Sequence, residues 1–114
     1  MIRLAGLLSA LALPLGQAEE PPVRVVVMDP LALPLSCSCV DGVGQRRYDK
    51  LAAHLEQATG RQFKLTFEES LDLALRRIRS KPDFIIGKDA MVRFDAKRLK
   101  LTVTPLADLT DRDG

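Results

Sequence analysis

Two cysteines and one histidine are the residues of this 114-residue chain best suited to nucleophilic, redox or metal chemistry. Cys37 and Cys39 are separated by one residue, so they could form a local disulfide, stay as free thiols or bind a soft metal together with His54. No serine or cysteine stands at a matching spacing from His54, which we interpret as a surface or partly buried side chain rather than a general base. We therefore expect no enzymatic activity, no resident metal and no cofactor.

A second group of candidates lies at residues 42–47, which read GVGQRR and precede a predicted helix. The backbone N–H groups of Gly44, Gln45 and Arg46 would then lie at the positive end of the helix dipole, where an oxyanion can bind. Arg46 and Arg47 either assist that anion or form an exposed, solvated face of the helix. The segment is not a dinucleotide fingerprint, because the third glycine of that motif is replaced by arginine.

Two further corners follow predicted strands and carry polar side chains. Ser70 follows two glutamates and offers a hydroxyl to a ligand, or simply caps the helix after it. Lys88, between Gly87 and Asp89, offers either a positive charge to a ligand or a solvated side chain.

The strands that would position these corners are predicted from hydrophobic patterning. Residues 23–28 (VRVVVM) form a nearly continuous β-branched run, typical of a strand covered on both faces, and residues 83–87 form a third, buried strand. Residues 63–67 alternate apolar and polar side chains, as an outer strand does. The alternation of residues 101–104 predicts a fourth strand.

Three helices alternate with these strands. Residues 45–58 carry apolar side chains at helical spacing, including Tyr48, and stop at Gly60. Ser70 caps a second helix with an apolar stripe that Pro82 ends. Residues 89–97 predict a short third helix.

The predicted element order, βαβαβαβ, indicates a doubly wound three-layer α/β unit with a mainly parallel sheet. Because the first and third strands are more continuously apolar than the second, we expect a strand order that begins 2-1-3. Residues 29–44 form a loop much longer than the usual two to six or so residues at such a corner, which predicts a functional loop.

The N-terminal residues are typical of a secretory signal rather than of the folded domain. A positive start is followed by an apolar run over residues 4–16 and by small residues, so we expect residues 1–18 to be a signal peptide. The run is shorter than the roughly 20 residues of a spanning helix. We therefore expect an exported protein, periplasmic or secreted, without a stable membrane span. A net charge of +2 and five aromatic residues argue against nucleic-acid binding.

Several short motifs together are similar to one protein family. They are the exported start, VRVVVMDP at residues 23–30, the helix with Tyr48 ending in Thr59-Gly60, the Ser70 helix and KPDFIIG at residues 81–87. In this order they resemble the substrate-binding proteins of phosphate, phosphite and phosphonate ABC transporters. The likeness runs from Val23 to the C-terminus.

The resemblance implies a type 2 periplasmic binding protein, in which two α/β lobes close on an anionic ligand and deliver it to a membrane permease. It implies ligand contacts at the helix start, the Ser70 corner and the third corner, here Gly44, Gln45, Arg46, Tyr48, Ser70, Gly87, Lys88 and Asp89. The third corner lacks the serine and tyrosine that the family often carries after the glycine. The chain is also shorter than a two-lobe protein, so we expect residues 19–114 to be a truncated first lobe.

The sequence thus favours a monomeric, non-enzymatic solute-binding component of an ABC transporter, with a small oxyanion as ligand and a permease as partner. The alternative hypothesis is a secreted redox or metal-handling module that uses Cys37 and Cys39.

Overall fold

The computed structural model describes residues 20–110, so the predicted signal peptide at residues 1–18 lies outside the described residues. The elements follow one another as β1 (Val23–Val27), the 3-10 helix η1 (Ser38–Val40), α1 (Tyr48–Thr59), β2 (Phe63–Phe67), α2 (Leu71–Ile78), β3 (Phe84–Ile86) and α3 (Asp89–Arg98). The predicted alternation of strands and helices is therefore confirmed up to residue 98.

The three strands form one parallel sheet in the order β2-β1-β3. Val23 of β1 pairs with Phe63 of β2, and Val25 pairs with Phe84 of β3. β1 is central and almost wholly buried, as its run of β-branched residues predicts. The α/β class and the 2-1-3 order expected from the sequence are both confirmed.

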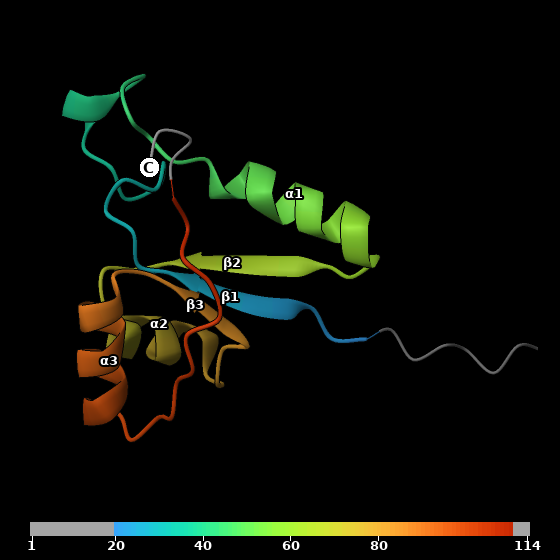
Figure 1. The fold of residues 1–114 in the computed structure, drawn as a ribbon, viewed down its shortest axis with the longest axis vertical. Helices are drawn as coiled ribbons and strands as arrows, with labels where there is room; N and C mark the ends of the chain where they lie inside the picture. The colour runs from blue at the N-terminus through green and yellow to red at the C-terminus, as the bar shows by residue number, and fades with distance from the viewer. Residues whose placement is uncertain (1–19, 111–114) are drawn as a thin grey trace, which may run out of the picture.

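Alternate residues of β1 supply two separate apolar clusters, one on each face of the sheet. Val23, Val25 and Val27 pack with Tyr48 on the face that α1 covers. Val26 and Met28 pack on the opposite face with the buried apolar side chains of α2 and α3, which are Leu71, Ala74 and Ala96. Figure 1 shows α1 on one side of the sheet and both other helices on the opposite side.

Local capping sets the ends of α1 and α2. Gly60 ends α1 in the left-handed region with φ of 70°, and its N–H donates to Glu56 O at 2.8 Å. Ser70 begins α2, where its hydroxyl accepts a hydrogen bond from the backbone N–H of Leu73. The predicted C-terminal glycine and the predicted serine cap are both confirmed.

The predicted fourth strand at residues 101–104 is wrong. Within residues 20–110 the sheet contains only β1, β2 and β3. The N–H of Leu101 instead donates to Ala96 O at the end of α3, and Leu101 and Val103 pack against the cluster around Val26. The apolar alternation therefore reflects one-sided packing of an extended segment rather than strand pairing.

None of the helices formed by residues 20–110 has the length and apolar character needed to cross a membrane.

Candidate functional site

A pocket of about 310 Å³ opens at the carboxyl edge of the sheet, where all three strands end. Its lining comes from each of the three strand-to-helix corners and consists of Met28, Pro30, Leu35, Glu69, Lys88 and Met91. We call it the carboxyl-edge pocket. In doubly wound sheets, ligands bind at this edge, where crossovers leave toward opposite faces. Residues from the corners after β1, β2 and β3 therefore line one hollow.

The carboxyl-edge pocket carries one positive and one negative side chain. Lys88 and Glu69 are both exposed, and no ion pair in the described part of the chain involves either of them. Lys88 stands at the N-cap of α3, where no side chain caps the helix. The neighbouring Asp89 is paired with Arg93, its Oδ1 2.8 Å from Arg93 Nε. Lys88 is thus available to a bound anion, whereas the Asp89 carboxylate faces its own helix partner.

Ser70 lies beside Glu69 but acts as a helix cap. Its Oγ accepts a hydrogen bond from the N–H of Leu73 at 3.3 Å. The N–H of Leu71 donates to the carboxylate of Asp95, which comes from α3 and is only 7% exposed. Of the two interpretations of Ser70, the structure shows the cap, and Asp95 already occupies the anion position at the start of α2. Nothing in the sequence singles out Asp95, because its partner is 24 residues away.

Gly87 allows α3 to approach the end of β1 closely. A Cβ atom at this position would lie 3.0 Å from Cγ2 of Val92 and 3.2 Å from Cβ of Met28. A side chain at this corner would require Val92 or Met28 to shift, so Gly87 has a packing role whether or not it contacts a ligand.

A partly buried hydrogen-bond cluster joins the end of β1 to the start of α1. The hydroxyl of Tyr48 donates to Asp29 Oδ2 at 2.5 Å, and Arg46 Nη1 donates to the same oxygen at 3.0 Å. The other oxygen of Asp29 accepts the N–H of Leu31 at 2.9 Å. Arg46 and Tyr48 are both predicted site residues, whereas Asp29 was not predicted from the sequence. The sequence feature that could have indicated Asp29 is its position directly after the apolar run of residues 23–28.

Burial and hydrogen bonding shift the pKa values of this cluster in opposite directions. Burial raises the pKa of Asp29, but the hydrogen bonds from Tyr48, Leu31 and Arg46 outweigh it and bring the pKa below its usual value of 3.8. Burial, together with the hydrogen bond to Asp29, raises the pKa of Tyr48 to about 12. At neutral pH the cluster therefore holds a carboxylate, a neutral phenol and a guanidinium.

The helix after this cluster begins at Tyr48, three residues later than expected. The N–H of Arg46 donates to Leu31 O at 2.8 Å and its carbonyl accepts from Leu33, so the chain here is extended and bridged to residue 32. Gly44 precedes it with φ of 73°. The expectation that the helix begins at residue 45 is wrong, because strand-like pairing of Arg46 with residues 31–33 keeps the chain extended there.

Gln45 and Arg47 likewise interact with neighbouring side chains, through hydrogen bonds and an ion pair respectively. Gln45 Nε2 donates to Ser36 Oγ at 2.8 Å and to Asp41 Oδ1 at 2.9 Å. Arg47 lies 2.7 Å from the carboxylate of Asp49 in an exposed ion pair. The hydrogen bonds of Gln45 close the long loop, and Gly44, Gln45 and Arg46 are not among the residues that line the carboxyl-edge pocket.

Cys37 and Cys39 form a disulfide, with Cα atoms 5.2 Å apart, and neither residue of the pair is a free thiol. His54 is exposed on α1. No three metal-binding side chains gather anywhere in residues 20–110. The structure thus shows the local disulfide and does not bring His54 to the cysteines.

A second hollow, of about 290 Å³, lies along β2 next to the end of α2 and is lined by Arg24, Lys64, Leu65, Thr66, Phe67, Arg77 and Ile78. Two of its cations already have partners. Arg24 donates to Ile78 O at 3.3 Å, and Arg77 lies 3.2 Å from Glu68. It lies along β2 and does not join the three strand-to-helix corners, which makes it the weaker candidate.

No family model, no curated protein and no solved structure matches this chain. Function must therefore be inferred from the side chains that line the carboxyl-edge pocket.

Proposed function

We propose that the protein is the first lobe of an exported solute-binding protein that holds a small organic oxyanion in the carboxyl-edge pocket and hands it to an ABC transporter permease. The observation that carries the proposal is the convergence of three strand-to-helix corners on one pocket whose positive group, Lys88, has no ion-pair partner among residues 20–110. A binding role suits this geometry because three separate strand ends contact one small volume.

The mixed lining of the pocket favours an oxyanion with an alkyl group over a bare inorganic ion. The ammonium of Lys88 would pair with the oxyanion, and the apolar side chains of Met28, Leu35 and Met91 would bury the alkyl group. The carboxylate of Glu69, which lines the same pocket, disfavours a ligand that carries additional negative charge. We therefore place a short alkylphosphonate ahead of phosphite and phosphate as the ligand.

One lobe covers only part of such a ligand, so the affinity of this chain should be weak. Binding sites usually bury most of a small ligand, and the burial excludes competing water. A second lobe that closes over the pocket would strengthen binding without new contacts from residues 20–110.

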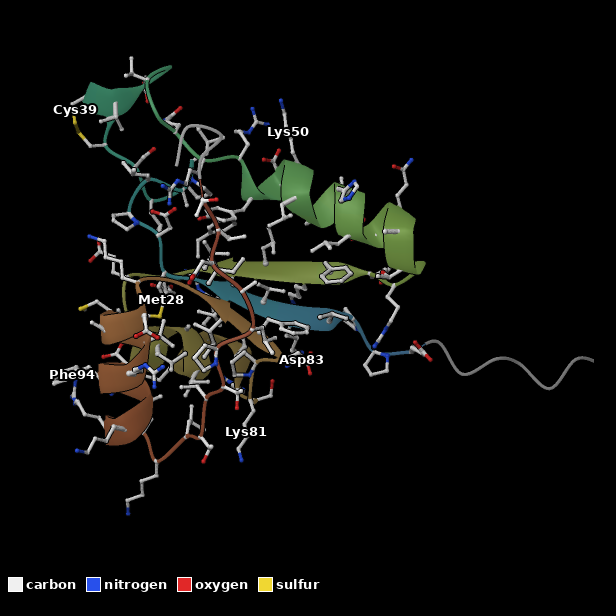
Figure 2. The ribbon with its side chains drawn as sticks, in the orientation of Figure 1. Met28, Cys39, Lys50, Lys81, Asp83 and Phe94 are labelled. Atoms are coloured by element: carbon white, nitrogen blue, oxygen red, sulfur yellow. A yellow bond between two sulfur atoms is a disulfide. The ribbon has the colours of Figure 1, made fainter. Side chains whose placement is uncertain are left out.

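Isothermal titration with ethylphosphonate, phosphite and phosphate tests the proposal. We expect heat from ethylphosphonate and a loss of affinity of about 10- to 100-fold in Lys88→Ala, because a hydrogen bond to a charged group contributes about 1.5–3 kcal/mol. The matched control is Lys81→Ala, which removes an exposed lysine far from Met28 (Figure 2). The ligand class is wrong if none of the three anions gives heat, and the site is wrong if the two lysine variants bind alike.

A further inference from the structure

The disulfide between Cys37 and Cys39 lies at an exposed end of the long loop. Both cysteines are exposed, and neither belongs to the two apolar clusters of the fold. Figure 2 shows Cys39 at the outer end of the loop, well away from Met28. An external thiol can therefore reach the sulfur atoms without any part of the core opening.

We infer that this disulfide is a thiol-exchange site with a fixed direction, in which an incoming thiolate attacks Sγ of Cys39 and Sγ of Cys37 leaves. The inference is independent of the proposed ligand binding, because it rests on the cysteine loop alone.

The direction follows from an asymmetry between the two sulfur atoms. The backbone N–H of Cys39 donates a hydrogen bond to Sγ of Cys37 at 3.1 Å. Sγ of Cys39 accepts no hydrogen bond from any residue in the described range. A hydrogen bond of this kind strengthens when the acceptor becomes a thiolate, so it stabilises Cys37 as the departing group. The better leaving thiolate departs faster, and attack is therefore directed to Cys39.

The exchange balances as two successive displacements. A thiolate RS⁻ forms a bond with Sγ of Cys39, the Cys37–Cys39 bond breaks, and its electron pair goes to Sγ of Cys37. A second thiolate then attacks the R-group sulfur of the mixed disulfide and releases RSSR and the Cys39 thiolate. The two external thiols are oxidised, and the protein disulfide is reduced to two thiols.

The surrounding contacts allow this reaction to proceed without loss of the loop. A disulfide across one intervening residue closes almost no chain and so adds little to stability. The loop is held on both sides of the cysteines by the hydrogen bonds from Gln45 to Ser36 and Asp41. The pairing of residue 32 with residue 46 closes its base. The cysteines can therefore cycle between oxidised and reduced forms on an intact fold.

The test maps the first adduct. The oxidised protein is mixed briefly with limiting reduced glutathione and quenched in acid. Free thiols are then alkylated with N-ethylmaleimide, and the peptide containing both cysteines is sequenced by tandem mass spectrometry. We expect glutathione in excess on Cys39 and the maleimide on Cys37. The double variant Cys37→Ser, Cys39→Ser should take up neither reagent and keep the circular dichroism spectrum of the parent protein.

Each other outcome overturns the inference. Glutathione mainly on Cys37, or equally on both residues, would show that the hydrogen bond does not direct attack. Alkylation of both cysteines before glutathione is added would show that the disulfide does not form. A disulfide that resists glutathione while the parent protein remains folded would show that the site does not exchange.

Discussion

The carboxylate of Asp95, in α3, accepts a hydrogen bond from the backbone N–H of Leu71, the first residue of α2, at 3.0 Å. Both residues are buried. The contact ties together the two helices that cover one face of the sheet, and it places a carboxylate at the positive end of the α2 dipole. Asp95 thus performs at α2 the role that a bound anion would otherwise have.

Replacement of Asp95 by alanine should lower the free energy of unfolding by about 1–3 kcal/mol, because it leaves the buried N–H of Leu71 without its acceptor. Urea unfolding followed by circular dichroism measures the change. The control is Asp89→Ala on the same helix, which removes an exposed ion pair with Arg93 and should cost about 0.5 kcal/mol or less. Equal losses in the two variants would contradict the capping role of Asp95.

Ionisation of Tyr48 should occur at unusually high pH in the folded protein. Burial and the hydrogen bond to Asp29 raise the pKa of Tyr48 to about 12, against 10.0 for a free tyrosine. The folded state therefore keeps the proton longer than the unfolded state, so this contribution to stability is complete below about pH 10 and is lost as pH rises toward about 12.

Tyr48 is the only tyrosine and the chain has no tryptophan, so ultraviolet absorbance of tyrosinate reports on this residue alone. We expect a titration midpoint near 12 in buffer and near 10 in concentrated urea. A folded protein that titrates near 10 would show that the hydroxyl is not held by Asp29.

Acid should weaken the fold through Asp29. Its pKa is below the usual value of 3.8 because the hydrogen bonds from Tyr48, Leu31 and Arg46 outweigh the effect of burial. The folded state thus binds fewer protons than the unfolded state. The resulting stabilisation is complete above the usual pKa of aspartate, and it is lost as the pH falls through the lowered pKa of Asp29 in the folded state. The free energy of unfolding of Asp29→Asn should therefore depend less steeply on pH between about 5 and 2. Identical slopes for the variant and the parent protein would refute this.

Gly87→Ala should destabilise the fold by about 1–3 kcal/mol, because the new methyl group would meet Val92 Cγ2 at 3.0 Å. Val92→Ala removes the obstructing atoms. Thermal or urea unfolding of the two single variants and the double variant gives the coupling between the sites. We expect the double variant to lose less than the sum of the single losses, and strict additivity would show that the contact is not responsible.

Arg24 should stabilise the amino edge of the sheet through the end of α2. Its Nη1 donates to Ile78 O at 3.3 Å and to Ser80 Oγ, while its backbone N–H donates to Asp83 Oδ2 at 2.8 Å. Arg24→Met keeps much of the aliphatic stem and should lower the free energy of unfolding by about 1 kcal/mol. Arg76→Met, which removes an exposed pair with Asp72, is the matched control and should cost about 0.5 kcal/mol or less. If Arg24→Met lowered the free energy of unfolding less than the control does, the hydrogen bonds of Arg24 to the end of α2 would not be stabilising.

Local patterning was enough to predict most of the fold. The β-branched run at residues 23–27 predicts a central strand, and the serine at residue 70 and the glycine at residue 60 predict helix ends, because burial periodicity and capping act over a few residues. The same reasoning fails at residues 101–104. The alternation of apolar and polar residues indicates which side chains are buried. It does not indicate whether they pack against a neighbouring strand or against a layer of helices.

The candidate site was only partly predictable, because local patterns do not show which distant segments pair with each other. Lys88 and its corner follow a predicted strand, and their place at the pocket follows from the parallel sheet. The start of α1 was misplaced because the pairing of residues 31–33 with residue 46 keeps the chain extended there.

The amino-acid sequence by itself determined the order of strands and helices up to residue 98, the central place of β1 and the edge of the sheet where a ligand site could form, because the patterns that predict them lie in residues close together along the chain. Only the tertiary structure decided that Asp29 would be bound by Tyr48 and that Asp95 would cap α2. These partners are 19 and 24 residues apart, and only the packed sheet and helices bring them within hydrogen-bond distance.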